Sequence, residues 1–455
     1  MDRRRRLFVA SCAALVVGAM TFSICTDVMG DFERVFHLTK AQVGEAVSWG
    51  AIGGVAVLFL GGALLDFIGI ARVFWLAFAS YLVGLTMVIL AQGFWTLAVA
   101  WLFLAIAGSL VQAAISPLAA TLYPENKTRI MNHLHAWFPG GLILGGLLAY
   151  GLTKLLALPA MPDALRENAW RIKLATAFVP AVLFAVLIVG QKFPKTERVQ
   201  AGVSAGAMFR EALRPMFLVL VFCMCLTASV ELGPNRWVGV FIQDIVGIRG
   251  ILMLIYTSGL MFALRFLAGP LAKRISSTGM LLGSSLLSGL GLVALSYATG
   301  PVTLFLAATV FGVGVTYFWP TMLGTTAERF PKGGAFLLGI VGAAAGLFLA
   351  YVTVPQMGRL HDHYTLTNLP PAVAEQVVVA GRVDAGRAEN LGAEDQAALD
   401  QARKTAASTT FRYVAILSAV LLVVFSGILL HDRLTRRRGQ GEPAANLGPP
   451  PGEQA

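Results

Sequence analysis

Charged side chains are scarce in this sequence. Asp, Glu, Lys and Arg make up only 13% of its 455 residues, whereas 57% of the residues are hydrophobic. The mean hydropathy is +0.73. So little charge cannot cover the surface of a soluble globule of this length, and apolar runs of about twenty residues recur along the chain. The composition therefore predicts an all-α polytopic membrane protein.

Cysteine is also rare, and the common catalytic motifs are missing. The four cysteines all lie inside apolar runs, namely Cys12, Cys25, Cys223 and Cys225. This placement argues against a disulfide framework, and the i, i+2 spacing of the last two directs them to different helix faces, which argues against a shared metal site. The sequence has no Walker loop, no G-x-S-x-G, no H-E-x-x-H and no glycine-rich nucleotide loop. We expect neither an enzyme nor an ATP-driven pump, and we expect no metal and no cofactor apart from a coupling ion.

Twelve apolar runs are long enough to cross a bilayer. The first, residues 7–29, follows the arginines at residues 3–6, and we interpret it as a retained helix rather than a signal peptide because no A-x-A cleavage site follows it. The short loops carry more Lys and Arg on the side of the amino terminus than on the other side. This bias predicts that both termini lie in the cytoplasm, and we expect the membrane to be a bacterial inner membrane. It also explains the net charge of +11 without nucleic acid, since the basic residues are scattered among loops.

Three polar segments interrupt the apolar pattern. Residues 191–214 separate six runs from six, and we interpret them as a cytoplasmic linker between an N-terminal half, residues 1–190, and a C-terminal half, residues 215–431. An insertion at residues 362–410 is rich in Ala, Glu, Gln and Arg and is expected to form one or two helices outside the membrane, as a solvated cap or a partner-binding site. The tail, residues 432–455, is expected to be disordered in the cytoplasm.

A glycine-rich, charged motif follows the second run and is echoed in the second half of the chain. Both copies read G-x-L-x-charge, from Gly62 to Asp66 and from Gly269 to Lys273. The glycines would let helices approach closely at a turn, and the charged side chains are expected to sit in water at the membrane edge. The residues assigned to this conformational motif are Gly62, Asp66, Gly69, Arg72, Gly269, Lys273 and Arg274.

Two carboxylates inside the apolar runs are candidate coupling groups. A charged side chain inside a membrane span is costly, so each one is a functional candidate by default. Asp27 lies in the outer half of the first run and either faces the solute and the coupling ion or forms a cap or ion pair at the outer end. Glu231 lies before a Gly-Pro break in the seventh run, as is typical of a transporter helix that bends around its ligand. The alternative for Glu231 is a surface pair with Arg236.

Polar and aromatic side chains at similar depth in both halves complete the candidate site. Gln112 in the fourth run and Tyr317 in the tenth could hydrogen-bond to hydroxyl groups, and Trp319 could stack on a sugar ring; the alternative for all three is helix packing. His135 is either a proton carrier or a satisfied interhelical histidine. Arg265 is interpreted as structural, with a side chain that snorkels toward the inner face. The candidate solute-binding residues are Asp27, Gln112, His135, Glu231, Asn235, Trp237, Tyr317 and Trp319.

These motifs resemble those of a known family. The stretch from Gly62 to Arg72 and its echo resemble the loops that follow the second and eighth helices of the major facilitator superfamily. Residues 25–44 and 108–117 are similar to the first and fourth helices of its fucose permease group. Asp27 falls on that group's essential aspartate, whereas Gln112 stands where the group has a second essential carboxylate.

The resemblance implies a fold and a function. The fold would be two six-helix halves that rock about a midplane site. The function would be secondary active transport of a sugar or a similar polyhydroxylated solute, coupled to a proton or to sodium. The alternatives are a drug or metabolite exporter of the same superfamily and a transporter-like sensor or receptor. The expected partners are a small-molecule solute and the lipid bilayer, and the protein is expected to be a monomer.

Overall fold

The structure, a computed structural model, describes residues 2–38, 40–246, 250–379 and 381–441. Within these residues eleven helices are long and apolar enough to cross a membrane, and the bent pair Ile255–Arg265 and Ala268–Ile275 makes a twelfth span with a 64° break. The twelve expected spans are therefore found, and the eighth is broken. The side chains of Asn235 and Trp237 lie outside the described residues.

The helices of residues 3–188 pack mainly against one another. Helix α5 lies against α3 and α4, and α1 lies against α7 and α10. Gly50 of α3 permits one of these contacts, because a Cβ atom there would lie 2.7 Å from the carbonyl oxygen of Trp101 in α5. The helices are α1 (Arg3–Asp27), α2 (Met29–Phe36), α3 (Lys40–Ile68), α4 (Ile70–Ile89), α5 (Phe94–Leu122), α6 (Lys127–His135), α7 (Trp137–Leu156), α8 (Asp163–Glu167), α9 (Ala169–Ala175) and α10 (Phe178–Ile188).

The helices after residue 215 form the second group. Helix α16 packs against α17 and α23, and α13 packs against α19 and α23. The linker between the groups contains two short helices, α11 (Glu197–Gln200) and α12 (Ala205–Ala212). The other helices are α13 (Pro215–Val246), α14 (Gly250–Arg265), α15 (Ala268–Ile275), α16 (Ser277–Ser296), α17 (Pro301–Val315), α18 (Phe318–Arg329), α19 (Gly334–Phe348), the π-helical turn η3 (Leu349–Thr353), α20 (Val354–Asn368) and α23 (Ala393–Gly441).

The insertion, residues 362–410, folds as a cap and not as one or two isolated helices. Helix α20 leads to α21 (Pro371–Val377), a two-stranded hairpin of β1 (Val378–Val379) and β2 (Arg382–Val383), and α22 (Ala385–Glu389). Leu369, Val377 and Leu399 belong to a small apolar core of its own. Helix α23 then runs unbroken from this cap through the last span.

The expected disorder of the tail is corrected over its first ten residues. Helix α23 continues to Gly441, and Asp432 forms an ion pair with Arg329 of α18. This contact holds the helix beyond the last apolar run, and good helix formers such as arginine follow it. Residues 442–455 of the predicted tail lie outside the described residues.

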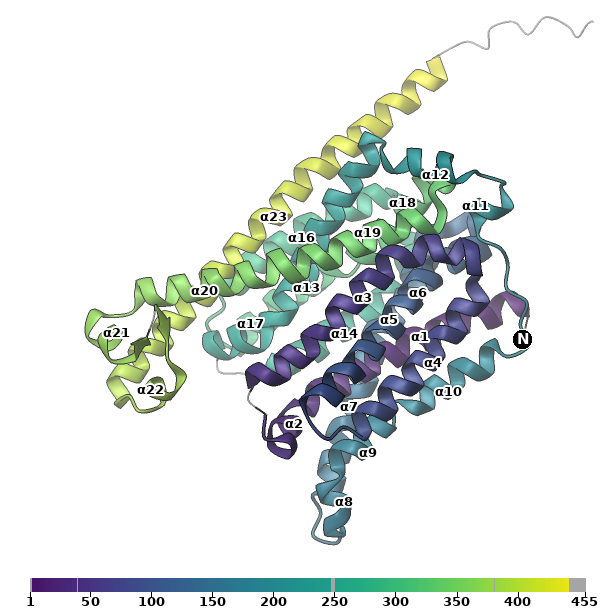
Figure 1. Cartoon of the computed structure of the whole chain (residues 1–455). Helices are drawn as coiled ribbons and strands as arrows, with labels where there is room; N and C mark the ends of the chain where they lie inside the picture. Colours follow the sequence, from purple (N-terminus) through teal and green to yellow (C-terminus); the bar gives the residue numbers. More distant parts are fainter. Residues whose placement is uncertain (1, 39, 247–249, 380, 442–455) are drawn as a thin grey trace, which may run out of the picture.

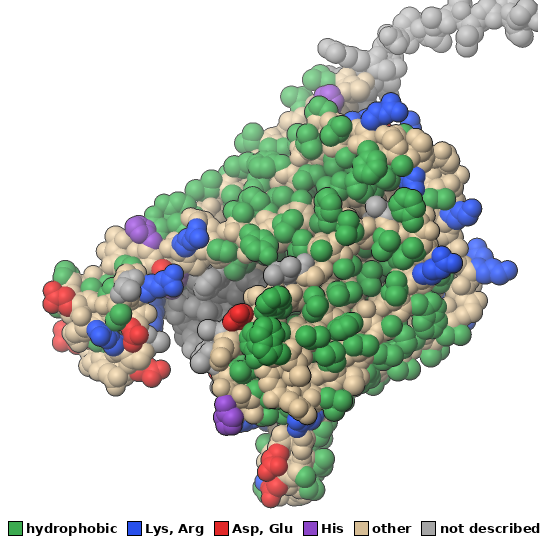
Figure 2. Space-filling model, in the orientation of Figure 1, with side chains coloured by type: hydrophobic (Ala, Val, Ile, Leu, Met, Phe, Trp, Pro, Cys, Tyr) green, Lys and Arg blue, Asp and Glu red, His purple; other side chains and the backbone are tan. Residues whose placement is uncertain are grey.

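The two ends of the bundle differ in charge. Figure 1 shows the amino terminus, α11 and α12 at one end and α21 with α22 at the opposite end. On the face seen in Figure 2, hydrophobic side chains cover the flank of the bundle, whereas Lys and Arg gather near α11 and α12. We call that end, formed by residues 3–6, 66–72, 124–129, 191–214 and 327–333, the basic end. Hydrophobic side chains on the flank are what contact with lipid requires.

Candidate functional site

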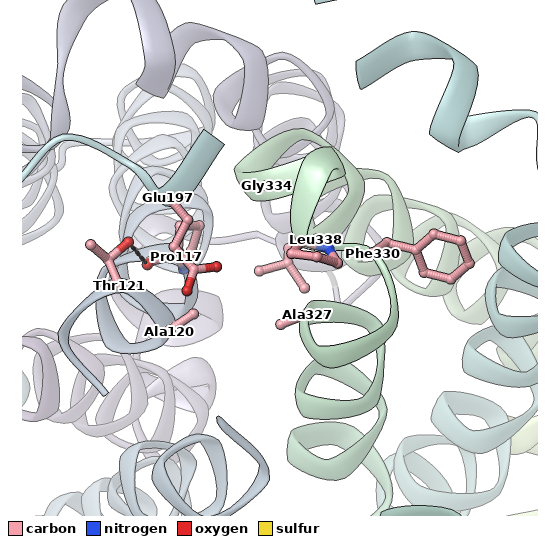
Figure 3. Close-up of a pocket in the computed structure, with 9 residues that line it drawn as sticks. Pro117, Ala120, Thr121, Glu197, Ala327, Phe330, Gly334 and Leu338 are labelled. Atoms are coloured by element: carbon pink, nitrogen blue, oxygen red, sulfur yellow. Dashed lines mark hydrogen bonds between the residues drawn. The ribbon is translucent and has the colours of Figure 1, made fainter. Parts of the chain in front are cut away.

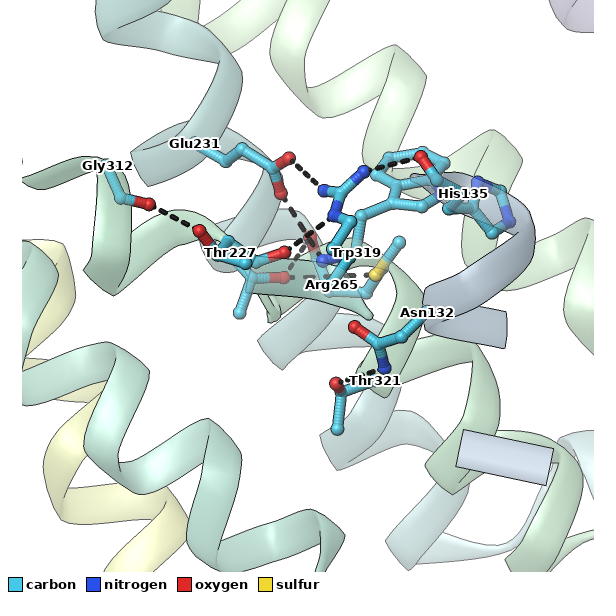
Figure 4. Close-up of polar contacts among 10 residues, drawn as sticks. Asn132, His135, Thr227, Glu231, Arg265, Gly312, Trp319 and Thr321 are labelled. Atoms are coloured by element: carbon cyan, nitrogen blue, oxygen red, sulfur yellow. Dashed lines mark hydrogen bonds and ion pairs between the residues drawn. The ribbon is translucent and has the colours of Figure 1, made fainter. Parts of the chain in front are cut away.

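A buried ion pair lies inside the bundle, where α13 meets α14. The Arg265 Nη2 atom is 3.2 Å from Glu231 Oε1, and the two side chains are only 3% and 4% exposed. Figure 4 shows the two groups facing each other. A charge pair this far from water must be well hydrogen-bonded, because its mutual attraction does not by itself repay the loss of hydration.

Backbone groups supply those hydrogen bonds and tie the pair to both halves of the protein. Arg265 donates from Nε to the carbonyl oxygen of Thr316 at 2.8 Å and from Nη1 to the carbonyl oxygen of His135 at 2.7 Å. The backbone N–H of Trp319 donates to Glu231 Oε2 at 3.3 Å. His135 belongs to α6, in the N-terminal group of helices. Arg265 therefore links the carboxylate of one half to the backbone of the other.

The pairing differs from the expectation that Arg265 snorkels to the inner face. Arg265 is 3% exposed and turns toward Glu231 instead. A signal was available in the sequence, because two opposite charges in neighbouring spans lower each other's cost of burial. The depth of Arg265 could not be read from its place in the chain, since the 64° break lies directly after it.

Gln112, Trp319 and the Ser116–His135 pair come together between the halves. The His135 Nε2 atom lies 3.2 Å from Ser116 Oγ, within hydrogen-bonding distance. Gln112, Ser116 and Trp319 line a cavity with Gly342 of α19. Its free space is only ≈ 20 Å³, which is about one water molecule. The halves are therefore closed on each other at this level.

Tyr317 lies apart from this cavity. Its hydroxyl donates to the carbonyl oxygen of Leu264 at 2.8 Å, and its ring packs with Ala268 and Met280. The structure thus brings Gln112 together with Trp319 but not with Tyr317.

Asp27 forms an ion pair within the N-terminal group of helices. Its Oδ2 atom accepts a hydrogen bond from Lys173 Nζ of α9 at 2.7 Å. The aspartate side chain is 38% exposed, whereas the lysine side chain is only 7% exposed. This geometry is that of an ion pair, which was one of the alternatives for Asp27. The sequence interpretation missed Lys173, whose signal was its place in the apolar sixth run.

The conformational motif is partly buried rather than hydrated. Asp66 was expected in water, but its side chain is 1% exposed, and it accepts hydrogen bonds from Thr196 Oγ1 and, at 2.6 Å, from Arg198 Nε. The linker folds back over the motif and replaces the water. Gly69 makes the turn between α3 and α4 with φ +83°, a conformation that glycine adopts without strain. Arg72 stays exposed.

The echo of the motif contains one close contact between the halves. A Cβ atom on Gly269 would lie 2.7 Å from Cδ of Arg129, so a larger residue there would require the exposed Arg129 side chain to move aside. Lys273 and Arg274 are exposed, as expected. The surroundings of Gly62 lie outside the described residues.

Polar contacts close the basic end. Lys127 Nζ is 2.8 Å from Glu197 Oε2 of the linker and donates to the carbonyl oxygen of Ala327 at 3.2 Å. Thr128 donates from its hydroxyl to Glu328 Oε1 at 2.8 Å. Figure 3 shows α5 facing α18 and α19 beside Glu197, and only ≈ 10 Å³ is free there. A solute cannot pass this end in the state described.

Gly324 offers a test of this closure. A Cβ atom on Gly324 would lie 2.8 Å from Cα of Thr128, so Gly324→Ala should push the halves apart at the basic end. We expect a cysteine introduced as Ala327→Cys, at a buried position, to react with a water-soluble maleimide several times faster in the Gly324→Ala background. Gly346→Ala, with open space around its Cβ, is the matched control. An unchanged labelling rate would show that Thr128 shifts to make room for the added methyl group without separating the halves at the basic end.

Comparisons with known proteins show what the chain is similar to. The family model of the Major Facilitator Superfamily matches residues 7–355. A search of curated proteins finds no match. Among solved structures, FucP in its outward conformation superposes with a TM-score of 0.68 at 16% identity, over 92% of this chain and 99% of that one; a second structure describes FucP as the E. coli fucose:proton symporter.

Two other transporters are similar at lower identity. A proton:xylose symporter gives a TM-score of 0.66 at 14% identity, over 92% of this chain and 94% of that one. The human organic anion transporter MFSD10 gives 0.63 at 12% identity, over 93% and 100%. At these identities the likeness shows a shared fold. It confirms the two six-helix transporter architecture expected from the sequence.

Proposed function

Because this chain belongs to the Major Facilitator Superfamily, we propose that it carries a sugar or a similar polyhydroxylated small solute by alternating access, coupled to a cation. Its family and its apolar helices make it an integral membrane transporter. The solute and the coupling ion are the proposal. The fucose:proton and proton:xylose symporters among its structural neighbours support a sugar, although their likeness is one of fold.

The observation that carries the proposal is the Glu231–Arg265 pair. It is buried, and Arg265 also binds the backbone of His135 in the other half. A proton on Glu231, or a sodium ion on its oxygen atoms, would neutralise the carboxylate and weaken its hold on Arg265. The contact between the halves would weaken with it. Ion binding and rearrangement of the halves are thus linked through one side chain.

The residues around the small cavity suit a hydroxylated solute. Gln112 and Ser116 offer neutral hydrogen-bonding groups from α5, and Trp319 offers an aromatic face from the other half. The binding site of an exporter of apolar compounds would be lined mostly by apolar and aromatic side chains. Since the cavity is too small for a sugar when the halves are closed, we propose that it widens as they separate.

The orientation is also part of the proposal. The Lys and Arg at the basic end favour a cytoplasmic position for this end, in a bacterial inner membrane. The insertion, residues 362–410, would then lie outside. A cysteine at the exposed position Ala397 should react with an impermeant reagent added to intact cells; reaction only after the inner face is exposed would reverse the orientation.

Solute binding by Gln112 and Trp319 can be measured directly. A thermal-shift screen of the purified protein against sugars, with and without sodium and across pH, identifies a ligand. Gln112→Ala should then weaken its binding about tenfold, because a solute hydroxyl loses its partner in a buried site. Gln401→Ala, an exposed change of the same kind, should have no effect. Unchanged affinity in both Gln112→Ala and Trp319→Ala would assign these residues to packing.

A further inference from the structure

The break between α14 and α15 leaves a cavity on the flank of the C-terminal half. The helices diverge by 64°, and Pro270 in the first turn of α15 has no backbone N–H to continue the hydrogen bonds of α14. The cavity measures ≈ 510 Å³ and lies between these two helices, α16 and α17. That volume falls in the range of ligand sites, about 300–1,000 Å³.

The cavity is apolar and opens sideways. Leu264, Leu271, Met280 and Val313 are among the residues that line it. Two further lining residues, Leu267 and Leu287, are 56% and 37% exposed, so the cavity reaches the outer surface of the bundle. Water molecules bind weakly in such a space, because a buried water needs several polar partners for its hydrogen bonds. In a bilayer the flank is bathed in acyl chains, which fill apolar space at no loss of hydrogen bonds.

Two cations stand where the cavity meets the membrane edge. Lys273 and Arg274 occupy the last turn of α15, and Arg274 lines the cavity. Within the described part of the chain neither forms an ion pair with an acidic side chain. An unpaired basic residue at the membrane edge attracts an anionic headgroup.

We propose that this cavity binds an anionic glycerophospholipid of the bilayer. One acyl chain lies along Leu264, Leu271 and Met280, and the phosphate lies against Arg274.

A bound lipid would support the buried ion pair. Leu264 and Tyr317 form the inner wall of the cavity and are joined by a hydrogen bond of 2.8 Å. Their chain neighbours are Arg265 and Thr316, which are themselves joined by a hydrogen bond of 2.8 Å. A lipid acyl chain that fills the cavity holds this wall in place. Lipid binding stands independently of the proposed function, whereas an effect on transport rests on it.

The test compares phosphatidylglycerol with phosphatidylcholine on the delipidated, full-length protein. Binding is measured by native mass spectrometry, and stability by the melting temperature. Wild type should bind phosphatidylglycerol at least tenfold more tightly, and gain more thermal stability from it. Arg274→Gln should reduce the preference for the anionic lipid severalfold, and Lys273 accounts for what remains. Gly283→Leu should weaken the binding of both lipids, because Gly283 lines the cavity and open space surrounds its Cβ.

Matched controls separate the site from general effects. Lys332→Gln removes one exposed charge at the same end of the bundle, and Gly427→Leu adds the same side chain to an exposed face of α23. Both should bind lipid as the wild type does. Equal binding of the two lipids, or equal binding by Gly283→Leu and wild type, would overturn the proposal. Displacement of phosphatidylglycerol by equimolar oleate would overturn it too, by assigning the cavity to a free fatty acid. Sugar binding, measured separately, would be unaffected by that outcome.

Discussion

Arg265→Met should destabilise the protein by about 3–5 kcal/mol, the largest stability effect we expect of any single substitution. The change removes the guanidinium but keeps an unbranched side chain, so it leaves Glu231 buried without its charge partner. It also leaves the carbonyl oxygens of Thr316 and His135 without their donor. The melting temperature in mild detergent and the midpoint of unfolding in SDS both report the loss.

A second substitution distinguishes the cost of an unpaired charge from a loss of packing. Adding Glu231→Leu to Arg265→Met removes the stranded carboxylate and should restore most of the stability, because a buried ion pair is often no more stable than well-packed apolar side chains. Arg433→Met, at an exposed position, should change little. A double variant as unstable as the single one would show that packing, and not the charge, is what Arg265 contributes.

The length of the apolar runs was enough to predict the spans. A helix must carry about twenty apolar residues to cross a bilayer, so each span is marked by its own local sequence. Even the eighth, which the structure bends by 64°, is long and apolar enough to cross when its two helices are taken together. Glu231 could be selected in the same local way, because a carboxylate in a span is costly wherever it lies.

Contacts between distant segments were not predictable in this way. Asp66 was placed in water because its own neighbours mark a membrane edge. Its burial depends on Thr196 and Arg198, which reach it only when the linker folds back. Arg265 likewise finds Glu231 only through the packing of α13 on α14.

Depth in the membrane did not decide which way a side chain faces. Tyr317 and Trp319 lie at similar depth and were assigned to the same site. Side chains that are two residues apart on a helix point in directions roughly 200° apart around the helix axis, so Tyr317 and Trp319 cannot share a face. In the structure Trp319 lines the cavity with Gln112, whereas Tyr317 lines the cavity on the flank.

Glu231→Gln should abolish concentrative uptake while leaving solute exchange intact, and we expect uptake against a gradient to fall to background. Glutamine keeps the shape, and its one amide oxygen can still accept a hydrogen bond from either Arg265 or Trp319, which in Glu231 bond to different oxygens. It cannot take up a proton or supply a charged oxygen to sodium. Proteoliposomes loaded with solute measure exchange, and an imposed pH or sodium gradient measures concentrative uptake. Loss of both activities would point to a collapsed site rather than to uncoupling.

Asp27→Asn makes this test selective, because Asp27 is the other candidate coupling carboxylate. The Asp27 side chain is 38% exposed, and its ion pair with Lys173 joins only helices of the N-terminal half. Neutralising Asp27 therefore does not loosen a contact between the halves. If Glu231 couples the ion to movement, Asp27→Asn retains gradient-driven uptake and Glu231→Gln loses it. The reverse result, with uptake by Glu231→Gln at the normal rate and none by Asp27→Asn, would transfer the coupling role to Asp27. The Glu231–Arg265 pair would then hold the closed state together without sensing the ion.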